Sequence, residues 1–185
     1  MKNKEIIIPA AALTVICLAA TLLLSLTNFV TKGQIASVQK AQADNARMLV
    51  CPDAESFEEA PEYADAEVYK ALDAAGNVIG YTVMTSGKSY GGDIDVMTGF
   101  DNEGSISGVQ ILNIEDTPGL GMNAKKDAFR NQFSGKTAGD LTVSKTASLE
   151  TEVQAITGAT ITSNAVTKCV NEAWNAVFRE KGGQK

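Results

Sequence analysis

The sequence predicts an α+β fold attached to a single N-terminal transmembrane helix. Three observations support this prediction: an uncharged apolar segment at residues 6–30, four β-rich segments separated by short turns in the middle of the chain, and apolar residues at helical spacing near the C-terminus. Sequential strands joined by short turns form an antiparallel sheet, and helices must cover at least one of its faces. We therefore expect an antiparallel sheet flanked by helices within residues 51–185.

The first predicted element is a transmembrane helix at residues 6–30, preceded by a short tail at residues 1–5. No charged residue lies between Glu5 and Lys32, and a helix over this segment would be about 38 Å long, enough to cross a bilayer. The alternative is a cleaved signal peptide, but the apolar core is longer than a usual signal core and lacks a clear small-residue cleavage site. We expect a retained membrane anchor.

The charges that flank this helix indicate its orientation. Lys2 and Lys4 precede the apolar segment, and Lys32 and Lys40 follow it. The closeness of the first pair to the membrane favours an N-terminus in the cytoplasm. The chain would then be a single-pass protein of the cell membrane whose domain is extracytoplasmic.

The composition of this domain excludes several classes of function. Without the two lysines and one glutamate of the first 30 residues, 14 basic and 21 acidic residues remain, a balance unsuited to nucleic-acid binding. Seven of these acids fall between Asp53 and Glu67, which we expect to be a solvated face. The chain has no histidine, which excludes histidine-based nucleophilic catalysis and the usual zinc sites. We expect neither a catalytic residue nor a metal site.

The three cysteines do not indicate a metal cluster. Cys17 lies in the predicted transmembrane helix, and Cys51 and Cys169 lack C-x-x-C spacing. We expect the two outer cysteines to be buried thiols. A disulfide between them stays open, because its formation depends on a geometry that spacing does not define.

The elements that follow the membrane helix are predicted in order. A connecting helix at residues 31–50 is ended by Pro52. Two D-x-x-G turns, starting at Asp73 and Asp101, are expected to close with a left-handed glycine. They separate strands expected near residues 67–72, 78–85, 94–100 and 106–114.

A helix, a strand and a second helix are predicted after the sheet. The first helix is expected near residues 124–133, and the strand near residues 141–143. The last helix is expected at residues 164–179, where apolar side chains recur at steps of three and four, with Thr162 or Ser163 as its cap.

The turn before the last helix is the most informative candidate site. It reads Ala155-Ile156-Thr157-Gly158-Ala159-Thr160-Ile161-Thr162-Ser163. Unpaired N–H groups and a partial positive charge at a helix start favour an anion, so a phosphate carried on Thr160 would be stabilised there. The alternative is an ordinary helix cap, for which Thr and Ser are common.

Two glycine-rich loops at strand ends are further candidates. Tyr90-Gly91-Gly92 precedes the third strand, and Glu115-Asp116-Thr117-Pro118-Gly119-Leu120-Gly121 follows the fourth. Paired glycines permit close backbone approach, which suits contact with a flat aromatic ring. The alternative is that both loops are simply turns at the ends of the sheet.

Taken together, these motifs resemble a known family. The single anchor, Tyr90-Gly91-Gly92-Asp93-Ile94, the loop at residues 115–121 and Thr157-Gly158-Ala159-Thr160, in this order and spacing, are similar to the G subunit of the Rnf ion-translocating ferredoxin:NAD oxidoreductase. The resemblance extends over essentially the whole chain. The C subunit of the sodium-pumping NADH:quinone oxidoreductase shares the FMN-binding domain, but the compact length favours the Rnf member.

The resemblance implies that FMN is joined through its phosphate to the hydroxyl of Thr160, the last residue of a [Ser/Thr]-Gly-Ala-Thr motif. Three departures from the family pattern stand out: Thr157 replaces the commoner Ser, Gln154 occupies a position that usually holds Asp, and Asp116 is added before Thr117, which leaves the role of Glu115 open. The other implied cofactor-binding residues are Thr157, Gly158, Ala159, Thr162, Ser163, Glu115, Thr117, Gly119, Leu120 and Tyr90.

The resemblance also implies partners. A threonine hydroxyl needs a base, and a chain without histidine is unsuited to attach the flavin itself. An external flavin transferase is therefore expected, by resemblance one that uses FAD and a divalent metal and releases AMP. The other membrane subunits of the Rnf complex would conduct the ions, sodium or protons, because Cys17 is the only ionisable side chain of residues 6–30.

Two rival functions stay open at this point. The first is a stand-alone membrane-anchored extracytoplasmic flavin electron carrier that uses the same chemistry at Thr160. The second is an anchored binding or scaffold domain in which Thr160 only caps a helix.

Overall fold

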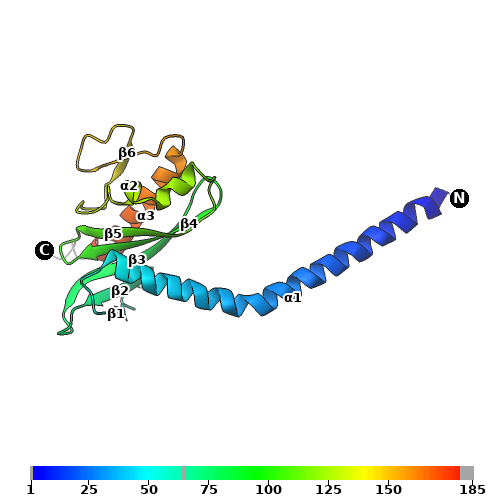
Figure 1. Ribbon diagram of the computed structural model, residues 1–185, viewed down its shortest axis with the longest axis horizontal. Helices are drawn as coiled ribbons and strands as arrows, with labels where there is room; N and C mark the ends of the chain where they lie inside the picture. Colours follow the sequence, from blue (N-terminus) through cyan, green and yellow to red (C-terminus); the bar gives the residue numbers. More distant parts are fainter. Residues whose placement is uncertain (1, 64–65, 180–185) are drawn as a thin grey trace. The chain divides into compact units, whose positions relative to one another are not determined.

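The computed structural model describes residues 2–63 and 66–179, and its long N-terminal helix, α1, spans Lys2–Val50 (Figure 1). The segments predicted as a transmembrane helix and a connecting helix are therefore one continuous helix, and Pro9 lies near its start, where a missing N–H costs little. The chain forms two compact units, of which the first ends at Gln42 and the second begins at Ala43.

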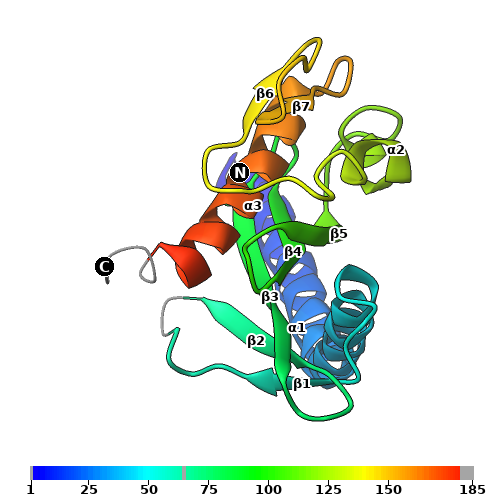
Figure 2. The same ribbon diagram turned by 90° about the vertical axis from the view of Figure 1, so that its left-hand side faces the viewer.

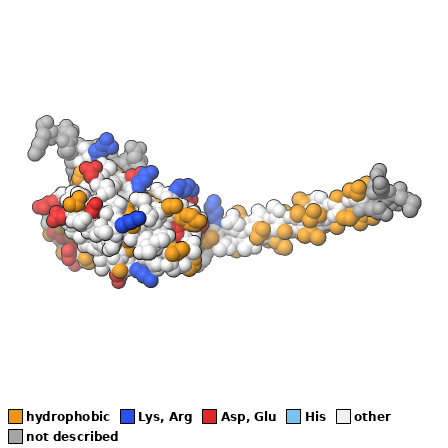
Figure 3. All heavy atoms as spheres, turned by 90° about the horizontal axis from the view of Figure 1, so that it is seen from above, with side chains coloured by type: hydrophobic (Ala, Val, Ile, Leu, Met, Phe, Trp, Pro, Cys, Tyr) orange, Lys and Arg blue, Asp and Glu red, His pale blue; other side chains and the backbone are white. Residues whose placement is uncertain are grey.

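The first unit has the properties of a membrane-spanning helix. One described helix is long and apolar enough to cross a membrane, and apolar side chains cover its surface (Figure 3). Thr14, Thr21 and Thr27 each donate a hydrogen bond to the carbonyl four residues earlier, at 2.8–2.9 Å. These hydroxyls are thus satisfied within the helix, as a bilayer interior requires.

The second unit contains a five-stranded antiparallel sheet with the strand order β1-β2-β3-β4-β5. The four predicted strands are confirmed, with slightly different ends, and an additional edge strand precedes them in the acidic segment. The acids of this segment that the structure describes are exposed. Because the segment has few apolar residues, its sequence does not show the alternation that predicts a strand. The strands are β1 (Ser56–Glu59), β2 (Glu67–Leu72), β3 (Val78–Lys88), β4 (Asp93–Asp101) and β5 (Ile106–Ile114).

Both predicted D-x-x-G turns are confirmed. Gly76 and Gly104 close them with φ of 81° and 88°. The Asp73 carboxylate accepts hydrogen bonds from the N–H groups of Ala75 and Asn77, both at 2.8 Å, and Asp101 binds its own turn in the same way. Each aspartate therefore fixes its turn through local backbone contacts.

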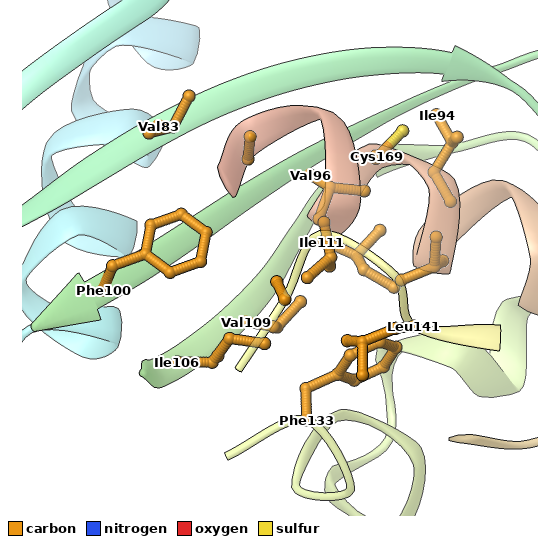
Figure 4. Packing of buried hydrophobic residues seen from close by; sticks show 14 of the residues in the cluster. Val83, Ile94, Val96, Phe100, Ile106, Val109, Ile111, Phe133, Leu141 and Cys169 are labelled. Atoms are coloured by element: carbon orange, nitrogen blue, oxygen red, sulfur yellow. The ribbon is translucent and has the colours of Figure 1, made fainter. Parts of the chain in front are cut away.

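Helices cover both faces of the sheet. Helix α3 (Thr160–Phe178) packs on one face and contributes Val166, Cys169 and Val170 to the larger core, part of which Figure 4 shows. Ala43, Ala46 and Val50, in the last turns of α1, belong to a smaller core on the other face. The two layers are visible in Figure 2, with α3 and the last, cyan turns of α1 on either side of β3 and β4.

The end of α1 meets the sheet at a site kept open by two glycines. Gly99 and Gly108 face each other across β4 and β5, and a Cβ on either would lie within 3.0 Å of Val50 backbone atoms. The Ser107 hydroxyl donates to the Val50 carbonyl at 2.5 Å, which satisfies a carbonyl that the helix leaves unpaired.

An ion-pair cluster attaches the same end of α1 to β2. The Arg47 guanidinium, only 4% exposed, bonds to Asp44 at 2.6 Å and to Glu67 at 2.8 Å. It also lies 3.7 Å from the ring centroid of Tyr69, a cation–π contact. Burial strengthens these contacts relative to an exposed pair.

The region after β5 differs from the prediction in two respects. The helix expected near residues 124–133 is two shorter elements, the 3-10 helix η1 (Gly121–Lys125) and α2 (Asp127–Arg130), because Lys126 between them is extended with ψ of 145°. The strand expected near residues 141–143 is β6 (Thr142–Ser144), which pairs in parallel with an unpredicted strand, β7 (Glu152–Gln154). Three-residue strands carry too little pattern to be recognised.

The two outer cysteines are buried and free. Cys51 belongs to the core under α1 and Cys169 to the core under α3, so the sheet separates them and the disulfide left open above is not formed. Burial raises the pKa of Cys51, and it raises that of Cys169 to about 11. Both are therefore neutral, unreactive thiols at neutral pH.

The glycine contact under Val50 generates a stability prediction. A Cβ at Gly99 would lie 2.5 Å from the Val50 carbonyl oxygen and 2.6 Å from Ser107 Oγ, so we expect Gly99→Ala to reduce the free energy of unfolding by about 1–3 kcal/mol. Denaturant titration of the detergent-solubilised chain, followed by fluorescence of its single tryptophan, Trp174, measures this. Gly33→Ala is the control, because a Cβ there meets no atom within 4 Å; equal stability of the two variants would contradict the prediction.

Candidate functional site

A cavity of about 480 Å³ opens where the two candidate loops meet the start of α3. The three segments are far apart in the sequence: residue 90 lies between β3 and β4, residues 116–121 follow β5, and residues 158–162 lead into α3. The cavity is lined by Tyr90, Asp116, Thr117, Leu120, Gly121, Gly158, Ala159, Thr160, Ile161 and Thr162.

One buried carboxylate connects the three segments. Asp116 is 4% exposed. Its Oδ2 accepts hydrogen bonds from Ser89 Oγ at 2.6 Å and Thr162 Oγ1 at 2.5 Å, and its Oδ1 accepts one from the Gly91 N–H at 2.6 Å. Charge-assisted bonds of this kind are stronger than neutral ones. Asp116 therefore holds the Tyr90 loop, its own loop and the first turn of α3 together.

These bonds keep Asp116 ionised. Burial alone would raise its pKa, but the bonds from Ser89, Thr162 and Gly91 outweigh burial and lower the pKa below its ordinary value of 3.8. The cavity thus has a permanent negative charge in its wall at neutral pH.

The close approach of the segments requires glycine at two positions. A Cβ on Gly121 would overlap the Asp116 carboxylate and lie 2.7 Å from Thr162 Oγ1. A Cβ on Gly91 would overlap the Glu115 carbonyl. Neither site accommodates a side chain without displacement of backbone or of Asp116.

The turn before α3 differs from the predicted cap. The helix begins at Thr160, its N-cap is Ala159, and no side chain caps it, so neither Thr162 nor Ser163 is the cap. Ser163 Oγ instead accepts a hydrogen bond from the Ile156 N–H and donates one to the Ala159 carbonyl, both at 3.0 Å, and Gly158 turns the chain with φ of 77°. The helix start is therefore open to an external anion.

The threonine hydroxyls of this turn have different surroundings. Thr160 is exposed and lines the cavity, whereas Thr162 is buried and bound to Asp116. Thr157 is exposed but lines a separate hollow of about 330 Å³, together with Gln154. Of the three threonines, Thr160 alone combines exposure with a place in the cavity.

The structure brings most of the predicted site residues together. Tyr90, Thr117, Leu120 and the turn residues from Gly158 to Thr160, with Thr162, line one cavity. Glu115, Gly119, Thr157 and Ser163 do not, although Ser163 shapes the turn.

Three residues that line the cavity were not predicted from the sequence as site residues: Asp116, Gly121 and Ile161. The resemblance had left open which acid of the Glu115-Asp116 pair is important, and the structure places Glu115 at the surface and Asp116 in the cavity wall. The only signal in the sequence was the extra carboxylate directly before Thr117. It does not predict burial, because an aspartate is seldom buried without hydrogen-bond partners.

The basic side chains near the site point elsewhere. Lys125 Nζ lies 3.5 Å from the Leu112 carbonyl, Lys126 lines the separate hollow, and Lys168 pairs with Glu172 at 3.6 Å. No Lys or Arg is among the residues that line the cavity.

The Asp116 bonds predict a pH-dependent contribution to stability. Because the folded pKa of Asp116 is lowered, its contribution is present above the unfolded pKa and is lost as the pH falls through the folded pKa. An amide cannot accept all three bonds, so we expect Asp116→Asn to cost about 1–3 kcal/mol of unfolding free energy at pH 7. Thermal or denaturant unfolding from pH 7 to pH 3 measures the difference between variant and wild type, which should shrink at the acidic end; a constant difference would contradict the prediction.

Two family models match the chain. The model described as the FMN-binding domain matches residues 89–175, which include the whole cavity, and the model of the RnfG N-terminal region matches residues 1–47.

Among solved structures, the C subunit of the Na(+)-translocating NADH-quinone reductase from Parabacteroides distasonis is 23% identical, with a TM-score of 0.54 over 65% of this chain and 64% of that chain. The NqrC structure from Shewanella oneidensis is 21% identical, with a TM-score of 0.53 over 72% of this chain and 70% of that one. At these identities the likeness shows a shared fold.

Curated relatives match over nearly the full length. The G subunit of the proton-translocating ferredoxin:NAD(+) oxidoreductase complex from Clostridium ljungdahlii is 38% identical over 93% of this chain and 91% of its own length. The G subunit of the Na(+)-translocating complex from Acetobacterium woodii is 38% identical over 86% of this chain and 85% of its own. The G subunit of an ion-translocating oxidoreductase complex from Methanosarcina acetivorans is 32% identical over 97% of this chain and 98% of its own. The chain therefore belongs to the family of G subunits of the Rnf ion-translocating oxidoreductase complexes.

Proposed function

We propose that this chain carries FMN in the cavity described above, joined by a phosphoester bond to Thr160, and passes electrons within an ion-translocating ferredoxin:NAD oxidoreductase. As a member of the G-subunit family, the chain is an electron-transfer subunit of such a complex. The observation that carries the finer proposal is the position of Thr160: exposed, in the cavity, and at the uncapped start of α3.

The cavity fits a flavin in size and chemistry. Its volume of about 480 Å³ lies within the range of roughly 300–1,000 Å³ that is usual for cofactor pockets. Tyr90, Leu120 and Ile161 are 72%, 44% and 56% exposed at the cavity, and large exposed apolar side chains gathered around a hollow suit a flat aromatic ring. A phosphate on Thr160 would meet unpaired N–H groups of the first turn of α3.

The attachment reaction needs an external enzyme. In the proposed step, the Thr160 hydroxyl oxygen bonds to the FMN phosphorus of FAD, the bond between the two phosphates breaks, and AMP leaves. The hydroxyl proton passes to a base of the flavin transferase, because this chain has no histidine and the carboxylate that lines the cavity, Asp116, is already occupied by three hydrogen bonds.

The bound flavin would supply reversible electron transfer, and this chain would supply position and environment. Tyr90, Leu120 and Ile161 would contact the ring, Thr160 would fix the phosphate, and Asp116 would hold the three cavity segments in register. Helix α1 would tether the FMN domain to the membrane that holds the other subunits.

The flanking charges and the length of the apolar helix support a membrane arrangement. We propose that residues 6–30 cross the membrane, that the N-terminus is cytoplasmic and that the FMN domain is extracytoplasmic. A stand-alone anchored carrier would use the same attachment, and co-purification with further membrane redox subunits distinguishes a complex from such a carrier.

The attachment site predicts a definite mass change. Chain produced together with a flavin transferase should carry the added FMN-phosphoryl mass on the peptide that contains Thr160, and the flavin fluorescence should survive denaturation. Thr160→Ala should abolish both signals, because the other hydroxyls of the turn lie buried or outside the cavity, and Thr117, which also lines the cavity, does not lie at the start of α3. Thr146→Ala, which removes an exposed hydroxyl in a loop away from the cavity, should leave both unchanged. Label that persists in Thr160→Ala would show that another residue carries the flavin.

The proposed orientation predicts which side of the membrane a reagent reaches. Cys51 and Cys169 are buried, and Cys17 lies within the proposed membrane span, so a cysteine placed at the exposed position of Thr146 reports the location of the domain. In cells whose cytoplasmic membrane is intact and whose outer layers admit the reagent, a membrane-impermeant maleimide should label Thr146→Cys but not the parent chain. Labelling that requires cell lysis would place the domain in the cytoplasm.

A further inference from the structure

The flavin cavity has an unusual charge for a site that is proposed to receive a phosphate. Asp116 is the only charged residue among those that line it, and no lining residue is basic. Sites that hold phosphates without a covalent bond commonly use Arg or Lys for this purpose. The favourable groups here are hydroxyls and the start of α3.

The other charged groups of the surrounding elements are occupied elsewhere. Lys88 pairs with Asp93 at the ends of β3 and β4, Lys125 points to the Leu112 carbonyl, and Glu115 is exposed outside the cavity. On α3, the first charged residue is Lys168, two turns beyond Thr160 and paired with Glu172. None of these groups neutralises Asp116, whose bonds come from two hydroxyls and one backbone N–H.

We propose that this cavity rejects the phosphate monoester of free FMN and that Asp116 is the residue that determines this specificity. Flavin then stays in the cavity only as the diester on Thr160, whereas riboflavin, which has no phosphate, binds more tightly than FMN. The inference rests on the proposed function, since it concerns the same cavity and cofactor.

The physical reason is the difference in charge between the two phosphates. A monoester carries about −1.5 to −2 charges at pH 7, whereas a diester carries about −1. The helix start offers only about half a positive charge. Asp116 lines the same cavity as Thr160 and bonds to Thr162 in the first turn of α3, so its full negative charge acts on a phosphate held at the helix start. Asp116 therefore opposes the attraction of the helix start, and it does so most strongly for the more highly charged monoester.

This specificity has a consequence for maturation. A cavity that bound free FMN well would be filled before attachment, and Thr160 would then be covered by the cofactor that it must receive from FAD. Rejection of the monoester keeps Thr160 accessible to the transferase. After attachment, the bond itself retains the diester, so the chain needs no phosphate-binding cation.

The test compares riboflavin with FMN on the unmodified full chain. The chain is produced in cells without a flavin transferase, shown to be unmodified by intact mass, and solubilised in an uncharged detergent. Flavin fluorescence titrations at pH 7.5 and low ionic strength should give an FMN affinity about three- to tenfold weaker than that of riboflavin. The FMN affinity should approach that of riboflavin at about 0.5 M salt, because salt screens the repulsion.

A second measurement on the same chain changes the ligand charge. The second phosphate pKa is about 6, so at pH 5 free FMN is mainly a monoanion, whereas riboflavin stays neutral and Asp116 stays ionised. The ratio of the two affinities should move toward one as the pH falls from 7.5 to 5.

The variant Asp116→Asn removes the charge. We expect this variant to bind FMN at least as tightly as riboflavin. Salt should now weaken FMN binding, because the partial positive charge of the helix start is then the main charge that acts on the phosphate. Riboflavin binding reports whether the cavity of the variant is intact. Glu103→Gln is the matched control, since it removes one acid at the exposed β4–β5 turn and should leave the affinity ratio of the wild type unchanged.

Three results would overturn the inference. These are FMN binding more tightly than riboflavin in the wild type, equal affinities that do not respond to salt or pH, and no detectable binding of riboflavin. Intact mass of chain made with the transferase tests the proposed function separately: covalent FMN on Thr160 combined with any of these results would retain the function and remove the specificity.

Discussion

The hydrogen bonds to the buried Asp116 carboxylate are the interaction on which the site depends. Ser89, Gly91 and Thr162 come from segments separated by up to about 70 residues, and each donates to the same carboxylate. A buried charge is costly unless it is paired or fully hydrogen-bonded. Asp116 satisfies this condition only when the Tyr90 loop, the loop after β5 and the start of α3 are all in place. The cavity and its negative wall are therefore formed together.

The sheet provides the rigid base for this arrangement. Its two faces have separate cores, and the larger core fixes α3, so the first turn of that helix, with Thr160, has a defined position at the cavity. On the opposite face, Val50 rests against Gly99 and Gly108, and Arg47 bonds to Glu67. The end of α1 is thus part of the folded domain, whereas the residues up to Gln42 form a unit of their own. Helix α3 and the end of α1 pack on opposite faces of one sheet, so each can pack without disturbing the other.

Hydroxyl groups of the same kind have different functions in the motif because of their surroundings. Thr162 is used to satisfy Asp116, and Ser163 shapes the turn through Ile156 and Ala159. Thr160 lines the cavity and is exposed to it. Among the hydroxyls of this turn, selection of Thr160 for modification then needs no special reactivity: it follows from which hydroxyl is reachable, and the proposed transferase supplies the base.

The sequence by itself determined the local features of this protein. Apolar length predicted a helix able to cross a membrane, and two Asp-x-x-Gly turns predicted four neighbouring strands, because these signals arise from contacts only a few residues apart. The motifs around Tyr90, Thr117 and Thr160 predicted three segments of one site. The tertiary structure alone decided that Asp116, and not Glu115, enters the cavity wall, that Thr160 begins α3, that Cys51 and Cys169 lie on opposite faces of the sheet, and that short strands such as β7 form at all. Each of these features depends on which distant segment a side chain contacts in the folded protein. The spacing of residues along the chain does not specify such long-range contacts.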